Sequence, residues 1–177
     1  MFAEQATLAA QIKNIVKGNV QNDWFLTAVV CLLEKNEQLI KRLFETKEAN
    51  EEGVYRVSLY VTGRWRTITV DDYIPCHANG GPFFSTITDK TIWLNILEKA
   101  LAKVHGGYRY LEGGTALEGL RTLTGVPITS FIFEEASVVE MLFNNSLRKL
   151  LVSFLSKRSF VVVASTEPNG TFFKESN

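Results

Sequence analysis

The chain has 177 residues, 46% of them hydrophobic, and its 19 basic residues balance 19 acidic ones. This length and apolar content suit one hydrophobic core, or one domain and part of a second, and exclude a disordered chain. Because the lysines and arginines are scattered and the net charge is zero, no surface for nucleic acid or for an anionic membrane is expected.

Neither a membrane span nor a disulfide framework is expected. The longest apolar run, 24–33, is about half the length that a bilayer requires, and no signal segment opens the chain. Cys31 and Cys76 lack a metal-type CxxC spacing, and one lies in an apolar segment while the other lies in a loop-like one. These features predict a reduced, cytoplasmic compartment.

The N-terminal part of the chain predicts helices. Apolar positions in 3–16 indicate a short helix or an ordered lead-in. The segment 24–34 is apolar on every side, which predicts a helix buried on every face, and Asn22 and Asp23 are suitable N-cap residues for it. A second helix is expected over 37–46.

The middle of the chain predicts a hairpin, a loop and a third helix. The segments 54–60 and 65–70 alternate in polarity around Thr62-Gly63, which is typical of a β-hairpin. The segment 71–90 contains prolines and glycines and is expected to be a loop. One apolar face over 91–104 predicts the helix that follows.

The C-terminal part predicts a mixture of helices and strands. Two capping-box patterns, 115–118 and 137–140, predict a short helix to residue 123 and a longer one to about residue 156. Gly125-Val126-Pro127 indicates a boundary. The apolar segments 128–133 and 160–164 predict strands, and the segment 167–170 predicts a turn.

The segment from Lys17 to Ala28 carries the most information about function. It reads KGNVQNDWFLTA and resembles the nucleophile motif of the calpain-type cysteine proteases, Q-G-x-L-G-D-C-W-[FL]-L-A-A. The match from Gly18 to Trp24 has no gap, so Asp23 stands at the position of the nucleophilic cysteine. Lys17 stands at the position of the glutamine that helps to form the oxyanion hole.

Three later segments resemble further motifs of this family, in the same order and at similar spacing. They correspond to the family's hairpin with its D-D-x-[IL]-P end, its L-E-K-A-x-A-K helix, and its L-x-G-G turn with the following T-G. The segments are 53–75, 92–108 and 111–125. The resemblance covers roughly residues 14–127.

The resemblance implies an α+β, papain-like calpain core. Residues 1–127 would form the helical, cysteine-side lobe, and residues 128–177 would form the beginning of a β-rich second lobe, apparently incomplete. In the family, the second lobe supplies the catalytic histidine and asparagine. The chain ends about where the histidine strand would begin.

A thiol protease needs a thiolate, a histidine and donors for the oxyanion, and Asp23 does not supply the first of these. A carboxylate such as that of Asp23 is a weak nucleophile toward an amide, and a position at a helix N-terminus lowers its basicity further. We therefore expect no catalytic residue: Asp23 would act as an N-cap, and Lys17 would be a surface lysine or pair with Asp23.

The calcium ligands that the family places in this lobe are also replaced. The resemblance puts Asn14 and Thr91 where the family has an aspartate and a glutamate. Because calcium affinity follows the number of charged ligands, we expect no calcium at this site, no other metal and no cofactor.

No other residues are expected to take over catalysis. Cys76 and His77 are neighbours in an extended loop, so their side chains would point to opposite faces instead of converging. Cys31 is expected to be a small buried apolar residue, and His105 is expected at a helix C-terminus, where imidazoles meet free carbonyl groups.

These observations predict a catalytically inactive calpain-like domain, a pseudoprotease, that binds protein partners within a larger polypeptide or assembly. Its degenerate cleft, with Lys17, Asp23 and Trp24, would hold a partner segment without cutting it. By analogy with the family, the partners would be cytoskeletal or ciliary. Two alternatives stay open: an active calcium-dependent endopeptidase in which Asp23 replaces a working cysteine, and a regulatory subunit of such an enzyme.

Overall fold

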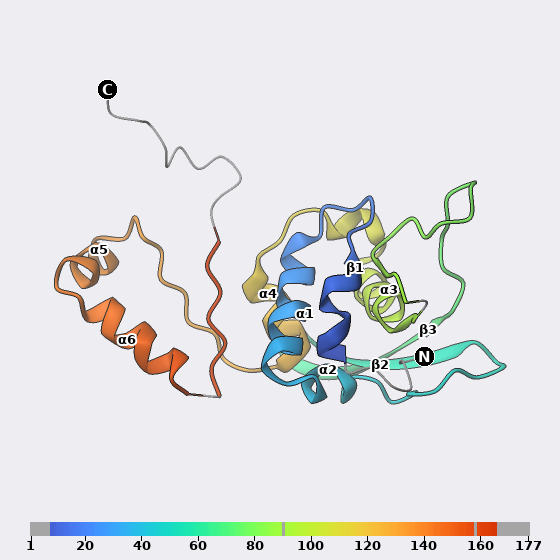
Figure 1. Cartoon of the computed structure of the whole chain (residues 1–177), viewed down its shortest axis with the longest axis horizontal. Coiled ribbons are helices and arrows are strands. Elements are labelled where there is room, and N and C mark those ends of the chain that lie inside the picture. The colour runs from blue at the N-terminus through green and yellow to red at the C-terminus, as the bar shows by residue number, and fades with distance from the viewer. Residues whose placement is uncertain (1–7, 90, 158, 166–177) are drawn as a thin grey trace, which may run out of the picture. The chain divides into compact units, whose positions relative to one another are not determined.

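The chain divides between Ser130 and Phe131 into a first unit, residues 1–130, and a second unit, residues 131–177. This computed structural model describes residues 8–89, 91–157 and 159–165 (Figure 1). In the described parts, no helix is both long enough and apolar enough to pass through a bilayer. Helices and strands are mixed, which confirms the α+β class.

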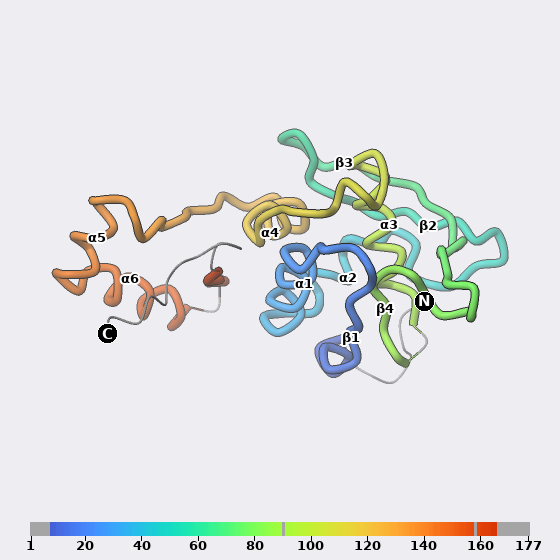
Figure 2. Tube along the Cα trace, turned by 90° about the horizontal axis from the view of Figure 1, so that it is seen from above, coloured from blue at the N-terminus to red at the C-terminus, as the bar shows by residue number. Residues whose placement is uncertain are grey.

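Two helices of the first unit, α1 (Asp23–Asn36) and α4 (Ala116–Thr124), lie side by side (Figures 1 and 2). Asn22 occupies the N-cap position of α1 without a side-chain cap hydrogen bond, and Asp23 is already the first helical residue. In α4, the predicted capping box forms: the Glu118 amide donates to the Thr115 hydroxyl, and the Thr115 amide donates to the Glu118 carboxylate.

The predicted hairpin is confirmed as β2 (Val54–Val61) and β3 (Arg64–Asp71). Thr62 and Gly63 connect the strands with φ values of 51° and 79°, the left-handed conformation that a tight two-residue hairpin turn requires. One face of the hairpin is buried against the helices, through Tyr55, Val57, Leu59 and Val70.

The second helix, α2 (Gln38–Lys41), is shorter than predicted because the following residues pair with β2. The Ser58 amide donates to the Leu43 carbonyl over 2.7 Å, and the Glu45 amide donates to the Arg56 carbonyl over 3.0 Å. Residues 43–45 thus lie along the outer side of β2 instead of continuing the helix.

The lead-in to α1 is a 3₁₀ helix, η1 (Leu8–Asn14), followed by β1 (Ile15–Val16). β1 pairs antiparallel with β4 (Thr86–Ile87), a short strand within the segment that was expected to be a loop. After β4 come α3 (Trp93–His105), which ends at left-handed Gly106, and η2 (Tyr108–Leu111).

The second unit contains α5 (Ala136–Phe143) and α6 (Ser146–Leu155) in place of the single predicted helix. The break falls at Asn145, whose φ of 59° is left-handed. The expected capping box at Ser137 does not form, because α5 begins two residues earlier than expected and has Glu135 as its N-cap.

The prediction of two strands in and next to this unit is wrong. Residues 128–133 and 160–164 are irregular, and neither segment pairs with a described strand. The turn predicted over 167–170 lies outside the described residues.

Candidate functional site

The loop that precedes α1 is held against the segment 83–85. The Asn19 amide donates a hydrogen bond of 3.0 Å to the Phe83 carbonyl. A Cβ atom at Gly18 would come within 2.3 Å of the Phe84 carbonyl carbon. Since only glycine fits this approach, Gly18 determines how the loop enters α1 and where Asp23 lies.

The Asp23 carboxylate forms an ion pair with the Lys17 ammonium. The two side chains are 66% and 41% exposed, so solvent screens the pair and its contribution to stability is small. The free amides of the first helical turn also favour a negative charge at Asp23. The structure therefore brings together the residues at the nucleophile position and the oxyanion position of the motif.

Trp24, in contrast, is a core residue. Its indole N–H donates to the Leu111 carbonyl over 2.9 Å, and a Cβ atom at Gly114 would lie 2.6 Å from the indole ring. The His105 ring meets the indole edge to face, with 6.2 Å between the ring centroids. Three residues were expected to form the cleft. Lys17 and Asp23 form an exposed ion pair, whereas Trp24 packs α1 against the core.

A buried carboxyl group, which the sequence did not single out, lies beneath the loop. Glu98 of α3 is fully buried, and its Oε1 accepts hydrogen bonds from the Asn22 side-chain amide at 2.5 Å and from the Ser85 hydroxyl at 2.8 Å. Its Oε2 accepts from the Ser85 amide at 3.0 Å. Glu98 therefore ties the residue before Asp23 to the segment 83–85.

Burial raises the pKa of Glu98, although the hydrogen bonds from Ser85 and Asn22 oppose this shift. The side-chain oxygen of Asn22 is also buried and has no partner among the described residues. One sequence signal for this cluster exists: Asn95 and Glu98 are the polar residues of the otherwise apolar segment 93–98, and both are buried.

The cysteines and the histidines are engaged elsewhere. The Cys76 thiol donates to the Ile74 carbonyl over 3.3 Å, while the ring of the neighbouring His77 packs on Phe83 with 4.7 Å between centroids. Cys31 is half-buried, and burial raises the pKa of its thiol. Among the described residues, no hydrogen bond or ion pair joins a histidine to the Asp23 carboxylate.

The residues at the family's calcium positions belong to a hydrogen-bonded network. The Asn14 carbonyl accepts from the Thr88 amide over 3.1 Å. The Thr91 amide and hydroxyl donate to Asp89 over 3.0 and 2.7 Å, and the Gln11 amide donates to the other oxygen of Asp89. A calcium ion requires six to eight oxygens, with several carboxylates among them, so this donor set fits it poorly.

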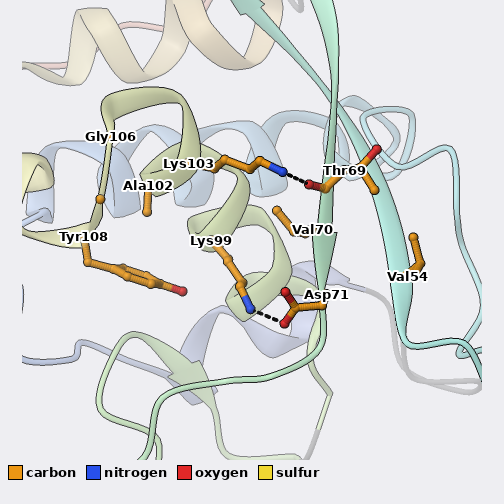
Figure 3. A pocket seen from close by; sticks show the side chains of 10 residues that line it. Val54, Thr69, Val70, Asp71, Lys99, Ala102, Lys103, Gly106 and Tyr108 are labelled. Atoms are coloured by element: carbon orange, nitrogen blue, oxygen red, sulfur yellow. Dashed lines mark hydrogen bonds and ion pairs between the residues drawn. The ribbon is translucent and has the colours of Figure 1, made fainter.

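No group of three or more His, Cys, Asp and Glu side chains that could hold a metal ion occurs within residues 8–89, 91–157 and 159–165. A cavity of about 620 Å³ lies between the end of β3 and the C-terminal half of α3 (Figure 3). A second one, of about 450 Å³, is bordered by Trp24 and His105. Neither is lined by Lys17 or Asp23.

Comparison with known proteins identifies the family. Residues 2–172 match the calpain family cysteine protease model. Calpain-type cysteine protease DEK1 is 42% identical over 113 residues in Zea mays and 39% identical over 117 residues in Arabidopsis thaliana. Calpain-10 of Mus musculus is 32% identical over 116 residues.

These matches cover 63%, 66% and 63% of the chain, but only 5%, 5% and 17% of the respective relatives. The chain thus spans a small part of the length of each relative. The family match, in contrast, extends over both units of the structure. The chain belongs to the calpain family of cysteine proteases.

Proposed function

We propose that the chain is a catalytically inactive calpain-family domain that binds protein segments within a larger polypeptide or assembly. The observation that carries this proposal is the ion pair between Asp23, at the nucleophile position, and Lys17, at the oxyanion position. By analogy with the family, we place its partners on cytoskeletal or ciliary structures.

The chemistry of the pair supports inactivity. A carboxylate at a helix N-terminus is a poor nucleophile, and an anhydride formed from it would be labile. The Lys17 ammonium is directed to Asp23 instead of serving as a fixed donor for an oxyanion. In a serine protease, loss of the nucleophile alone lowers turnover on the order of a millionfold.

Apolar side chains that remain exposed in the second unit support a larger context. Leu142, Phe143, Val152 and Leu155 are 46%, 85%, 55% and 66% exposed. Such surfaces normally contact another part of the protein or a partner.

The alternative, an active endopeptidase, has in its favour that the similar relatives are named cysteine proteases. The test is turnover of a fluorogenic peptide in calcium, with the 177-residue chain and with any longer native polypeptide. We expect no turnover by either form and no difference on Asp23→Ala. Turnover that Asp23→Ala abolishes would overturn the proposal.

Binding needs a separate test. Cross-linking mass spectrometry of the native complex should connect Lys13 and Lys17 to structural proteins. The double variant Asp23→Arg, Lys17→Glu removes the amine at position 17 and should also lose the cross-links of Lys13. Cross-links mainly to an intact calpain would instead favour a regulatory subunit. Partner contacts that survive the double variant would contradict a role for this ion pair.

A further inference from the structure

The outer edge of β3 is open. On the β2 side of the hairpin, the Arg56 carbonyl and the Ser58 amide bond to residues 43–45, so these two residues point away from β3. Their register partners are Thr69 and Thr67. In an antiparallel ladder, the N–H and the C=O of one residue point to the same side of the strand. The backbone N–H and C=O groups of Thr67 and Thr69 therefore point away from β2, and so do those of Trp65.

One of these outward groups has a partner within the described parts of the chain. The Lys103 ammonium donates to the Thr69 carbonyl over 2.7 Å (Figure 3). The Thr69 amide and both backbone groups of Trp65 and Thr67 have none. Trp65 is 46% exposed and the two threonines are exposed as well. A strand edge of this kind is a template for another extended segment.

Positive charge surrounds the edge. Arg64 and Arg66 are exposed on β3 itself, and Lys99 and Lys103 reach it from α3. Two acidic side chains lie near these cations: Asp71 is paired with Lys99, and the Glu45 carboxylate accepts a hydrogen bond from the Thr67 hydroxyl over 2.6 Å. A second copy of β3 would bring its own arginines against this charge, whereas an acidic segment would complement it.

A pocket for a side chain adjoins the edge. The cavity of about 620 Å³ is lined by Val70, Ala102 and Tyr108 together with the two lysines (Figure 3). An ammonium group has three N–H donors. Lys103 uses one of them, on Thr69, and Lys99 uses two, on Asp71 and on the Tyr73 carbonyl, so donors remain for a ligand carboxylate.

We propose that β3, from Trp65 to Thr69, binds an acidic extended peptide segment of a partner protein by strand addition. The Lys103 ammonium leaves the Thr69 carbonyl for a peptide carboxylate, and the freed carbonyl accepts a peptide N–H. An apolar side chain of the peptide enters the cavity beside α3. Backbone pairing provides affinity, and the cavity and the lysines provide specificity. This surface is separate from Lys17 and Asp23, so the inference stands whether or not the chain is a protease.

Amide exchange measured by NMR on the 177-residue chain tests the pairing directly. The probe is an eight-residue peptide of alternating glutamate and valine, blocked at both ends. Its addition should slow exchange at Trp65, Thr67 and Thr69, while the ladder amides of Arg66 and Ile68 are already slow without it. Binding that protects other amides and leaves these three unchanged would overturn the proposal.

Matched variants test the two sources of affinity by fluorescence anisotropy. Thr67→Pro removes an outward N–H that the hairpin does not use, and should weaken binding about tenfold, whereas Thr67→Val keeps the N–H and should bind as wild type. Lys103→Glu should weaken binding at least as much, while Lys47→Glu, at an exposed site elsewhere, should have little effect.

Circular dichroism establishes whether each variant is folded, and the wild-type exchange experiment does not depend on any of them. Equal affinity for a peptide of alternating lysine and valine, or wild-type affinity in folded Thr67→Pro and Lys103→Glu proteins, would refute strand addition by an acidic segment.

Discussion

Glu98 shows most clearly how one residue can couple the candidate site to the core. Its carboxylate accepts three hydrogen bonds in a fully buried position, and no ammonium or guanidinium group of the described residues is paired with it. Hydrogen bonds offset part of the free-energy cost of burying a charge, but the raised pKa indicates that they do not offset all of it.

The raised pKa of Glu98 predicts a specific pH dependence. The folded state holds the proton more tightly than the unfolded state, so the stability linked to this group is fully present below the unfolded pKa, near 4.5, and is lost as pH rises through the folded pKa. The free energy of unfolding of wild type should therefore fall relative to that of Glu98→Gln over this range in urea titrations. Glu112→Gln, at an exposed position, is the control. Parallel pH curves for wild type and Glu98→Gln would contradict this account.

At the scale of elements, the contact between α1 and α4 depends on a glycine. A Cβ atom at Gly119 would lie 2.8 Å from the Cβ of Ala28 and 3.3 Å from the Trp24 carbonyl oxygen. Both atoms are fixed to helical backbone, so neither can move aside cheaply. The close helix crossing is thus a consequence of the missing side chain.

Gly119→Ala should destabilise the protein by about 1–2 kcal/mol. Overpacking costs about 1–3 kcal/mol, and the better helix propensity of alanine returns up to about 1 kcal/mol. Urea unfolding followed by tryptophan fluorescence measures the difference. The same substitution should cost less in an Ala28→Gly background, because the clashing methyl group is gone. A stabilised Gly119→Ala protein would show that the helices separate readily.

Two elements with local signals could be predicted from the sequence, while those that depend on distant partners could not. The two-residue turn of the hairpin and the Thr115 capping box are set by neighbouring residues, and both form. The expected strands 128–133 and 160–164 are apolar, but a strand requires a pairing partner, which periodicity cannot reveal. Left-handed Asn145 splits the expected long helix.

The same distinction holds for the candidate site. Lys17 and Asp23 are six positions apart, and their pairing could be suggested from the motif. The bond between Asn22 and Glu98 spans 76 positions, so only the folded chain brings the two together.

The division between Ser130 and Phe131 and the predicted boundary at residue 127 both lie in the irregular segment after α4.

At the scale of the whole molecule, the hydrophobic core belongs almost entirely to the first unit. Among the described residues, the buried apolar side chains outside it are Val138 and Leu147. All three tryptophans, at positions 24, 65 and 93, are also in the first unit. Tryptophan fluorescence therefore reports unfolding of this unit.

A chain that ends at Ser130 should consequently fold by itself. Its core residues are retained, so the urea midpoint measured by tryptophan fluorescence should match that of the 177-residue chain. The far-UV circular dichroism of the longer chain should show the additional helical signal of α5 and α6. A truncated protein that lacks a cooperative transition would show that the first unit depends on the second.

Alkylation of the two thiols provides a chemical probe of α1. Cys76 is exposed and should react with iodoacetamide quickly, whereas Cys31, half-buried on α1 with a raised thiol pKa, should react more slowly. The slow phase of alkylation then reports how accessible the Cys31 thiol is on the helix that begins at Asp23. In a Cys76→Ser protein this phase remains alone, so the accessibility of α1 can be followed without a ligand.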